Sequence, residues 1–219
     1  MKFSKTLITT AILGFSLTSF HYTAWADTPD QQFQQGFEAV RRDDYQAAFK
    51  LWLPLAEQGY SSAQYNLGVM YQYGRGVKQD DFEAVKWYRK AAEQGDGSAQ
   101  SSLGFMYING QGVRQNDFEA VKWFSKAAEQ GDAKAQVSLG FMYQGGRGVK
   151  QDDFEAVKWF SKAADQGNAA SQFVLGMSYL LGKGVQVNKF LAKEWFGKAC
   201  DNGEKKGCEY YGKLNRGEL

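Results

Sequence analysis

The chain repeats itself with a fixed period of 36 residues. Segments 80–95, 116–131 and 152–167 read DDFEAVKWYRKAAEQG, NDFEAVKWFSKAAEQG and DDFEAVKWFSKAADQG. A tryptophan and a Gly-x-Gly-Val turn recur at the same interval over a longer stretch. The tryptophans are Trp87, Trp123, Trp159 and Trp195, and the second glycines of the turns are Gly76, Gly112, Gly148 and Gly184. A period of roughly 20 to 50 residues is typical of proteins built from stacked repeats.

Each unit is predicted to form two antiparallel helices. Ala63, Leu67 and Met70 recur at helical spacing and form an apolar stripe. The glycines that follow supply the left-handed backbone that ends a helix. Asp80 followed by Glu83 predicts a capping box, in which each side chain pairs with the backbone amide of the other residue. A single helix pair leaves an apolar face uncovered, and stacking further pairs covers it.

The combined pattern, A-x-x-x-L-G-x-x-Y-x-x-G-x-G-V and then D-x-x-x-A-x-x-W-x-x-K-A-A-x-x-G, resembles the Sel-1-like repeat (SLR), a relative of the tetratricopeptide repeat. The resemblance covers residues 61–203. It implies an all-α fold, a right-handed α/α superhelical solenoid of stacked antiparallel helix pairs. The expected segments are a signal peptide (1–26), a degenerate N-terminal helix pair (27–60), four repeats (61–96, 97–132, 133–168 and 169–204) and a C-terminal capping helix (205–219).

The N-terminus has the layout of a secretory signal. Lys2 and Lys5 precede an apolar stretch at 7–20, and Ala24-Trp25-Ala26 resembles a cleavage site. The apolar stretch is too short for a membrane span, which needs about 20 residues. We therefore expect cleavage after Ala26 and a periplasmic or secreted protein that does not span a membrane. Removing the two lysines leaves 24 basic against 24 acidic residues with interspersed signs, which argues against a nucleic-acid partner.

The mature chain offers little for catalysis. The single histidine, His21, lies in the signal, so no Ser-His or Cys-His pair remains and the commonest metal ligand is absent. Some cysteine-rich SLR proteins carry a β-lactamase or penicillin-binding label, but no mature serine here has a lysine three residues later, as Ser-x-x-Lys enzymes require. Carboxylates are abundant, but none forms a distinctive catalytic pair. We expect no enzymatic activity, no cofactor and no metal site.

The resemblance also suggests a role for the two cysteines. Cysteine-rich SLR proteins have two cysteines at similar spacing that bridge adjacent helices, which implies a disulfide between Cys200 and Cys208. Closing so small a loop stabilises a fold by about 2–3 kcal/mol on the chain-entropy estimate. The alternative is a reactive thiol pair, although the mature chain has neither a histidine nor a C-x-x-C motif to activate one.

The predicted binding surface follows from the resemblance as well. In related superhelices the first helix of each pair lines the concave side, and the residues opposite the apolar stripe vary here from unit to unit. The candidates for partner contact are Tyr65, Gln72, Tyr73, Asn109, Gln144 and Phe173. The larger apolar residues of that face are interpreted as packing between units; they are Val69, Phe105, Phe141 and Met177.

Two functions are compatible with these features. The first is an exported non-catalytic scaffold or adaptor that binds a protein or peptide partner on its concave face. The alternative is an immunity or inhibitor protein that neutralises a secreted toxic enzyme. The sequence leaves the oligomeric state open.

Overall fold

The computed structural model describes residues 27–219, and within that range the chain forms eleven α-helices and no strand. The helices are α1 Pro29–Arg41, α2 Tyr45–Glu57, α3 Ser61–Tyr73, α4 Asp81–Glu93, α5 Gly97–Asn109, α6 Asp117–Glu129, α7 Ala133–Gly145, α8 Asp153–Asp165, α9 Ala169–Leu181, α10 Lys189–Asp201 and α11 Lys205–Asn215. The all-α prediction is confirmed. The predicted signal peptide, its cleavage site and His21 lie outside the described residues.

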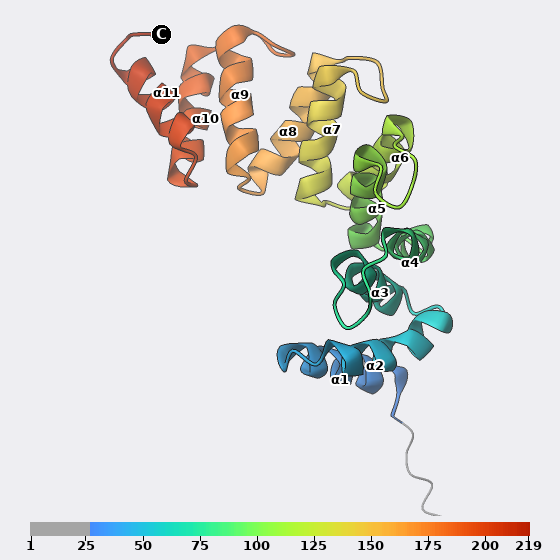
Figure 1. The fold of residues 1–219 in the computed structure, drawn as a ribbon. Coiled ribbons are helices and arrows are strands. Elements are labelled where there is room, and N and C mark those ends of the chain that lie inside the picture. Colours follow the sequence, from blue (N-terminus) through green and yellow to red (C-terminus); the bar gives the residue numbers. More distant parts are fainter. Residues whose placement is uncertain (1–26) are drawn as a thin grey trace, which may run out of the picture.

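The helices form a curved stack in which each helix packs mainly against its neighbours in sequence (Figure 1). The pair α1 and α2 lies at one end of the stack, and α11 lies at the other. Helix α5 also touches α7 directly, and α9 touches α11. Because the elements on the inside of a curve lie closest together, these contacts place the first helix of each pair on the inner side. The arrangement is the predicted α/α solenoid.

Within each pair, a glycine of the first helix faces an aromatic ring of the second. At each of these glycines an added Cβ atom would lie 2.5–2.6 Å from the nearest ring atom. Glycine therefore lets the two helices approach closely enough for the ring to be fully buried between them. The four glycine–ring pairs are Gly68 with Tyr88, Gly104 with Phe124, Gly140 with Phe160, and Gly176 with Phe196.

The recurring tryptophans also belong to the frame. Trp87, Trp123 and Trp159 are buried, and Trp195, in the last complete pair, is half-buried. A lysine three residues further along the helix places its ammonium group over each indole, at 4.1–4.6 Å from the ring centroid, which is cation–π geometry.

The second glycine of each Gly-x-Gly-Val turn is where one pair rests on the preceding pair. The φ angles of these glycines lie between 62° and 71°, in the left-handed region. A Cβ atom at Gly112 would collide with the backbone of Asp81, at the start of the preceding second helix. The same contact recurs at Gly76, Gly148 and Gly184, which meet the backbones of Tyr45, Asp117 and Asp153.

A buried glutamine links each pair to the one before it. Gln100 donates a hydrogen bond to the carbonyl of Ala92 in the last turn of α4, and it accepts one from Gln130 at the end of α6. Equivalent bonds of 2.7–3.1 Å are made by Gln64, Gln136 and Gln172, with Asn202 as the donor in the last pair. These glutamine hydrogen bonds satisfy backbone carbonyl groups that the stacking of the pairs removes from water.

The predicted capping boxes form only in part. The Asp80 side chain accepts a hydrogen bond from the amide of Glu83 at 3.0 Å, as expected, but the Glu83 carboxylate binds Lys86 instead of returning to the cap. The same outcome recurs at Asn116 and Asp152, whose glutamates pair with Lys122 and Lys158. An ammonium group is a stronger partner for a carboxylate than a neutral amide. The prediction of reciprocal boxes in these helices is therefore wrong.

Candidate binding groove

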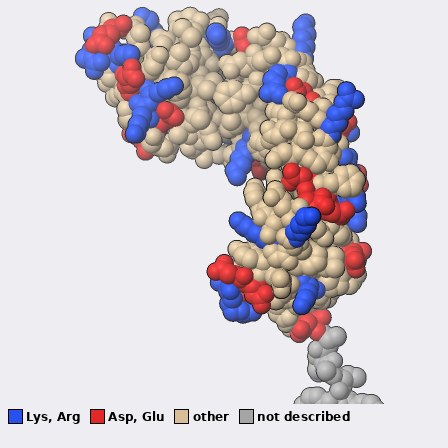
Figure 2. Space-filling model, in the orientation of Figure 1, with Lys and Arg blue, Asp and Glu red and all other residues tan. Residues whose placement is uncertain are grey.

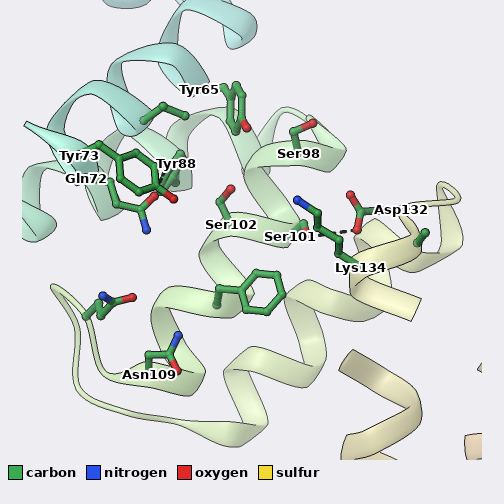
Figure 3. A pocket seen from close by; sticks show the side chains of 14 residues that line it. Tyr65, Gln72, Tyr73, Tyr88, Ser98, Ser101, Ser102, Asn109, Asp132 and Lys134 are labelled. Carbon is green, nitrogen blue, oxygen red and sulfur yellow. Dashed lines mark hydrogen bonds between the residues drawn. The ribbon is translucent and has the colours of Figure 1, made fainter. Parts of the chain in front are cut away.

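A groove of about 740 Å³ lies on the first-helix side of the stack. It is lined by residues of α3, α5 and the start of α7, with Tyr88 contributed from α4. Figure 3 shows Gln72, Tyr73 and Tyr88 on one side of the hollow and Asp132 with Lys134 on the other. The groove therefore extends over three consecutive repeats, and no single helix pair forms it.

One wall of the groove is aromatic. Tyr65 packs against Tyr88 with a centroid distance of 5.8 Å, and the Tyr88 hydroxyl donates a hydrogen bond to Oε1 of Gln72 at 2.6 Å. The position of Tyr88 is phenylalanine in the three repeats that follow, so this hydroxyl is particular to the groove. Burial raises the pKa of Tyr88, and burial together with the charge of Asp96 raises that of Tyr65. Both phenols thus stay protonated at neutral pH.

The opposite wall is polar. Ser101 donates a hydrogen bond to Oδ1 of Asp132 at 3.2 Å, and the same oxygen accepts the backbone amide of Ala135 at 2.7 Å. Asp132 is therefore the N-cap of α7, which accounts for its carboxylate at this place. Lys134 follows and is the single lysine or arginine among the lining residues.

Several polar side chains of the groove keep their hydrogen-bonding capacity. Tyr73 and Asn109 are exposed, and their side chains form no hydrogen bond with any residue of 27–219. The Asn109 amide offers two donors and one acceptor atom, and the Tyr73 hydroxyl can both donate and accept a hydrogen bond. Such groups match the alternating N–H and C=O groups of a peptide backbone, while the aromatic wall suits apolar side chains.

Four of the six predicted contact residues line this groove, namely Tyr65, Gln72, Tyr73 and Asn109. Gln144 is half-buried on α7 and lies outside the groove. Phe173 is half-buried and packs against Phe196 and against Tyr210 of α11, at centroid distances of 5.5 and 5.6 Å, so the C-terminal helix contacts it.

The groove also includes residues that the sequence did not single out. Ser98, Asp132 and Lys134 lie in the first turns of α5 and α7 or just before them. The pattern within one helix does not reveal that the next repeat closes the groove. The ring of Phe105, a residue interpreted as packing between units, packs edge-on against Phe124 of its own pair at 4.9 Å.

Figure 2 shows lysine, arginine, aspartate and glutamate side chains interspersed on the visible face.

The sulfur atoms of Cys200 and Cys208 lie at disulfide distance, with Cα atoms 4.5 Å apart, so the end of α10 is joined to the first turn of α11. Among residues 27–219, no helix is long and apolar enough to cross a membrane. The same range contains no group of three or more histidine, cysteine or acidic residues placed to hold a metal ion.

Comparison with known proteins identifies the repeat. The family model described as Sel1 repeat matches five consecutive segments of the chain, residues 33–60, 61–96, 97–132, 133–168 and 169–204. The first of these matches falls on α1 and α2, whose sequence departs most from the 36-residue pattern.

Two solved structures share the fold over most of the chain. One is c5321, described as a protective antigen present in uropathogenic Escherichia coli strains that displays an SLR fold. It is 39% identical with a TM-score of 0.82, and the match covers 85% of this chain and 41% of that protein. The other is a Sel1 repeat protein from Oxalobacter formigenes, which is 32% identical with a TM-score of 0.75 over 85% of this chain and 76% of that one.

Curated relatives match over a shorter stretch. DAP3-binding cell death enhancer 1 of Rattus norvegicus is 44% identical over 50 residues, which are 23% of this chain and 10% of that protein. The chain thus spans about a tenth of the length of this relative and about two fifths of the E. coli antigen.

Proposed function

Because the chain belongs to the Sel1 repeat family, we propose that it is an exported, non-catalytic scaffold that binds a segment of a partner protein in the groove. Repeats of this kind suit protein–protein interaction because stacked helix pairs present a long, curved and rigid surface. The partner-binding residues in this proposal are Tyr65, Gln72, Tyr73 and Asn109.

The groove itself carries the proposal. It combines exposed amide and hydroxyl groups that lack partners among residues 27–219 with an aromatic wall of Tyr65, Tyr88 and Phe105. Its one acidic lining residue, Asp132, is engaged as a helix cap. This set of groups favours the binding of a peptide segment over acid–base chemistry, which requires carboxylates poised at the reacting atoms.

Three observations support export. The first 26 residues have the composition of a secretory signal. Cys200 and Cys208 lie at disulfide distance, and disulfides persist in oxidising compartments. The similar E. coli protein is described as a protective antigen, which fits exposure outside the cytoplasm.

The proposal is tested by removing the exposed groove side chains. The double variant Tyr73→Ala/Asn109→Ala alters one position of the repeat in two successive units, and both side chains are exposed, so the fold should be retained. Leu181 occupies the same repeat position in the last pair, is 54% exposed and lies outside the groove, so Leu181→Ala is the matched control.

Affinity capture from envelope extracts should recover a partner with the wild-type protein and with Leu181→Ala, and much less of it with the double variant. Equal recovery with all three proteins would contradict the groove as the binding site. Turnover of a β-lactam or a cell-wall fragment by the purified protein would contradict the non-catalytic assignment. A captured toxic enzyme that loses activity when bound would identify the immunity or inhibitor role.

A further inference from the structure

Every complete repeat exposes a phenylalanine at the second position of its second helix. Phe82, Phe118, Phe154 and Phe190 are 60%, 67%, 67% and 70% exposed, although each follows the helix cap by only two residues. The buried ring of the same helix is a different residue, such as Phe124 in α6. These four residues, here called the phenylalanine row, therefore contribute little to the core of the solenoid.

The four rings lie along one rim of the stack. The turn glycine of the following pair approaches the backbone amide of Phe82, and the same contact is made to Phe118 and Phe154 by the next two turns. Each ring is thus one repeat away from the next along the line of Gly-x-Gly-Val turns. Extended apolar patches on the surface of a soluble protein mark interaction sites.

The area of the row is close to what a protein interface needs. A phenylalanine can bury about 150–250 Å², so rings that are 60–70% exposed offer about 130 Å² each and about 500 Å² together. A standard interface buries about 800 Å² on each partner. The exposed Val187, three residues before Phe190, and the alkyl stem of Lys86, whose ammonium group lies 4.5 Å from the Phe82 ring centroid, can add to this area.

A second copy of this chain fits the row in two respects. Its own row has the same spacing, so the two rows can be placed in register. The charges at the two ends are also opposite. Asp81 precedes Phe82, and Glu83 on its other side is paired with Lys86 of the same helix, whereas the first turn of α10 has no acidic residue and the exposed Lys189 precedes Phe190. An antiparallel arrangement brings the acidic end of each row to the basic end of the other.

Most of the acidic residues beside the two central rings are neutralised by ion pairs. Asp117 is paired with Arg147 at 2.9 Å, and Glu119 and Glu155 are paired with lysines of their own helices, so that Asp153 is the one acidic neighbour of Phe118 or Phe154 without an ion pair within residues 27–219. We infer that the phenylalanine row is the interface of an antiparallel homodimer in which Phe118 of one copy faces Phe154 of the other and Phe82 faces Phe190. The groove lies on the first-helix side and is not part of this interface.

The test is the oligomeric state of the purified protein and of the variant Phe118→Ser/Phe154→Ser, measured by sedimentation equilibrium over a range of concentrations. The wild-type protein should dimerise, and the variant should have a dimer dissociation constant at least about tenfold higher. Tyr73→Ser is the matched control, because Tyr73 is also an exposed aromatic residue, is 61% exposed and lies off the row. It should dimerise like the wild-type protein. Far-ultraviolet circular dichroism should show that both variants fold.

A wild-type protein that stays monomeric at every concentration overturns the inference, as does a dimer that the double substitution leaves unchanged. Binding of the monomeric protein to phosphatidylcholine–phosphatidylglycerol vesicles, lost in the double variant, would assign the row to a membrane surface and would also overturn it. After Phe118→Cys and Phe154→Cys proteins are mixed, a bifunctional maleimide should join the two variants to each other. Preferential joining of Phe118→Cys to itself overturns the antiparallel arrangement.

Discussion

Alanine substitutions at two glycines of one repeat, Gly112 and Gly131, distinguish how much backbone conformation and how much stacking contribute to the free energy of unfolding. Both have positive φ angles, 62° at Gly112 and 94° at Gly131. A Cβ atom at Gly112 would lie closer than 3.0 Å to the carbonyl group of Asp81 and to the amide nitrogen of Phe82, in the preceding pair. A Cβ atom at Gly131 would have no heavy atom within 4 Å.

The expected magnitudes follow from these geometries. An alanine in the left-handed region is destabilising by roughly 1–2 kcal/mol, and this strain is the only effect that we expect for Gly131→Ala. Gly112→Ala adds an overpacking term of about 1–3 kcal/mol. Because both colliding groups are backbone and cannot rotate away, we expect the upper part of the combined range, about 3–5 kcal/mol. Strain alone predicts the reverse order, because the φ of Gly131 lies further from the left-handed minimum.

The free energy of unfolding is measured by urea denaturation followed by far-ultraviolet circular dichroism, with the midpoint and the slope compared for both variants. A lower midpoint for Gly112→Ala than for Gly131→Ala supports the stacking contact. Equal midpoints, or a lower midpoint for Gly131→Ala, would refute the reasoning that the turn of each pair rests directly on the backbone of the preceding one.

Three further predictions concern the frame. Trp123→Ala should lower the free energy of unfolding by about 3–5 kcal/mol in the same assay, because it leaves a cavity where an indole is 97% buried. Thiol labelling without reductant should fail at Cys200 and Cys208 in protein recovered from the exported compartment, and full labelling of folded protein would contradict the disulfide. Burial raises the pKa of Tyr88. Above about pH 10 the Tyr88 hydroxyl therefore loses its proton in the unfolded chain but keeps it in the folded chain. The free energy of unfolding then falls with rising pH by up to about 1.4 kcal/mol per pH unit. Tyr88→Phe should remove that part of the slope in denaturation measurements between about pH 9 and 11, and an unchanged slope would contradict it.

The 36-residue period predicted the frame because each frame position has the same surroundings in every repeat. Trp123 is buried with a lysine over its indole, as are Trp87 and Trp159, and Gly112 makes the same backbone contact as Gly148. A constant environment selects a constant residue, so one sequence is enough to reveal it. The helices and their order followed from the same argument.

Features that depend on contact between repeats were harder to predict. Gln100 is polar but buried. Its hydrogen bonds to Ala92 and Gln130 become apparent only when α4 and α6 are placed around it. Glu83 matched the capping box by spacing, yet Lys86 on the same helix takes its carboxylate. Periodicity indicates which residues recur, but it does not decide between competing partners of a polar side chain.

The groove shows the same limit. Tyr65 and Asn109 could be selected because they lie on the variable face of a first helix. Asp132 and Lys134 could not, because they border the groove only through the step from one repeat to the next. Phe173 has the same repeat position as Tyr65, but Tyr210 of α11 packs against its ring, and no periodic argument applies at the end of a stack.

The most direct test of the central claim is the affinity of the captured partner for three purified proteins, measured by isothermal titration calorimetry. These are the wild type, Tyr73→Ala/Asn109→Ala and the control Leu181→Ala. We predict that the groove variant binds at least about tenfold more weakly, while the control stays within about twofold of the wild type. Equal affinities for the wild type and the groove variant would contradict the claim that this solenoid acts by holding a partner in its groove.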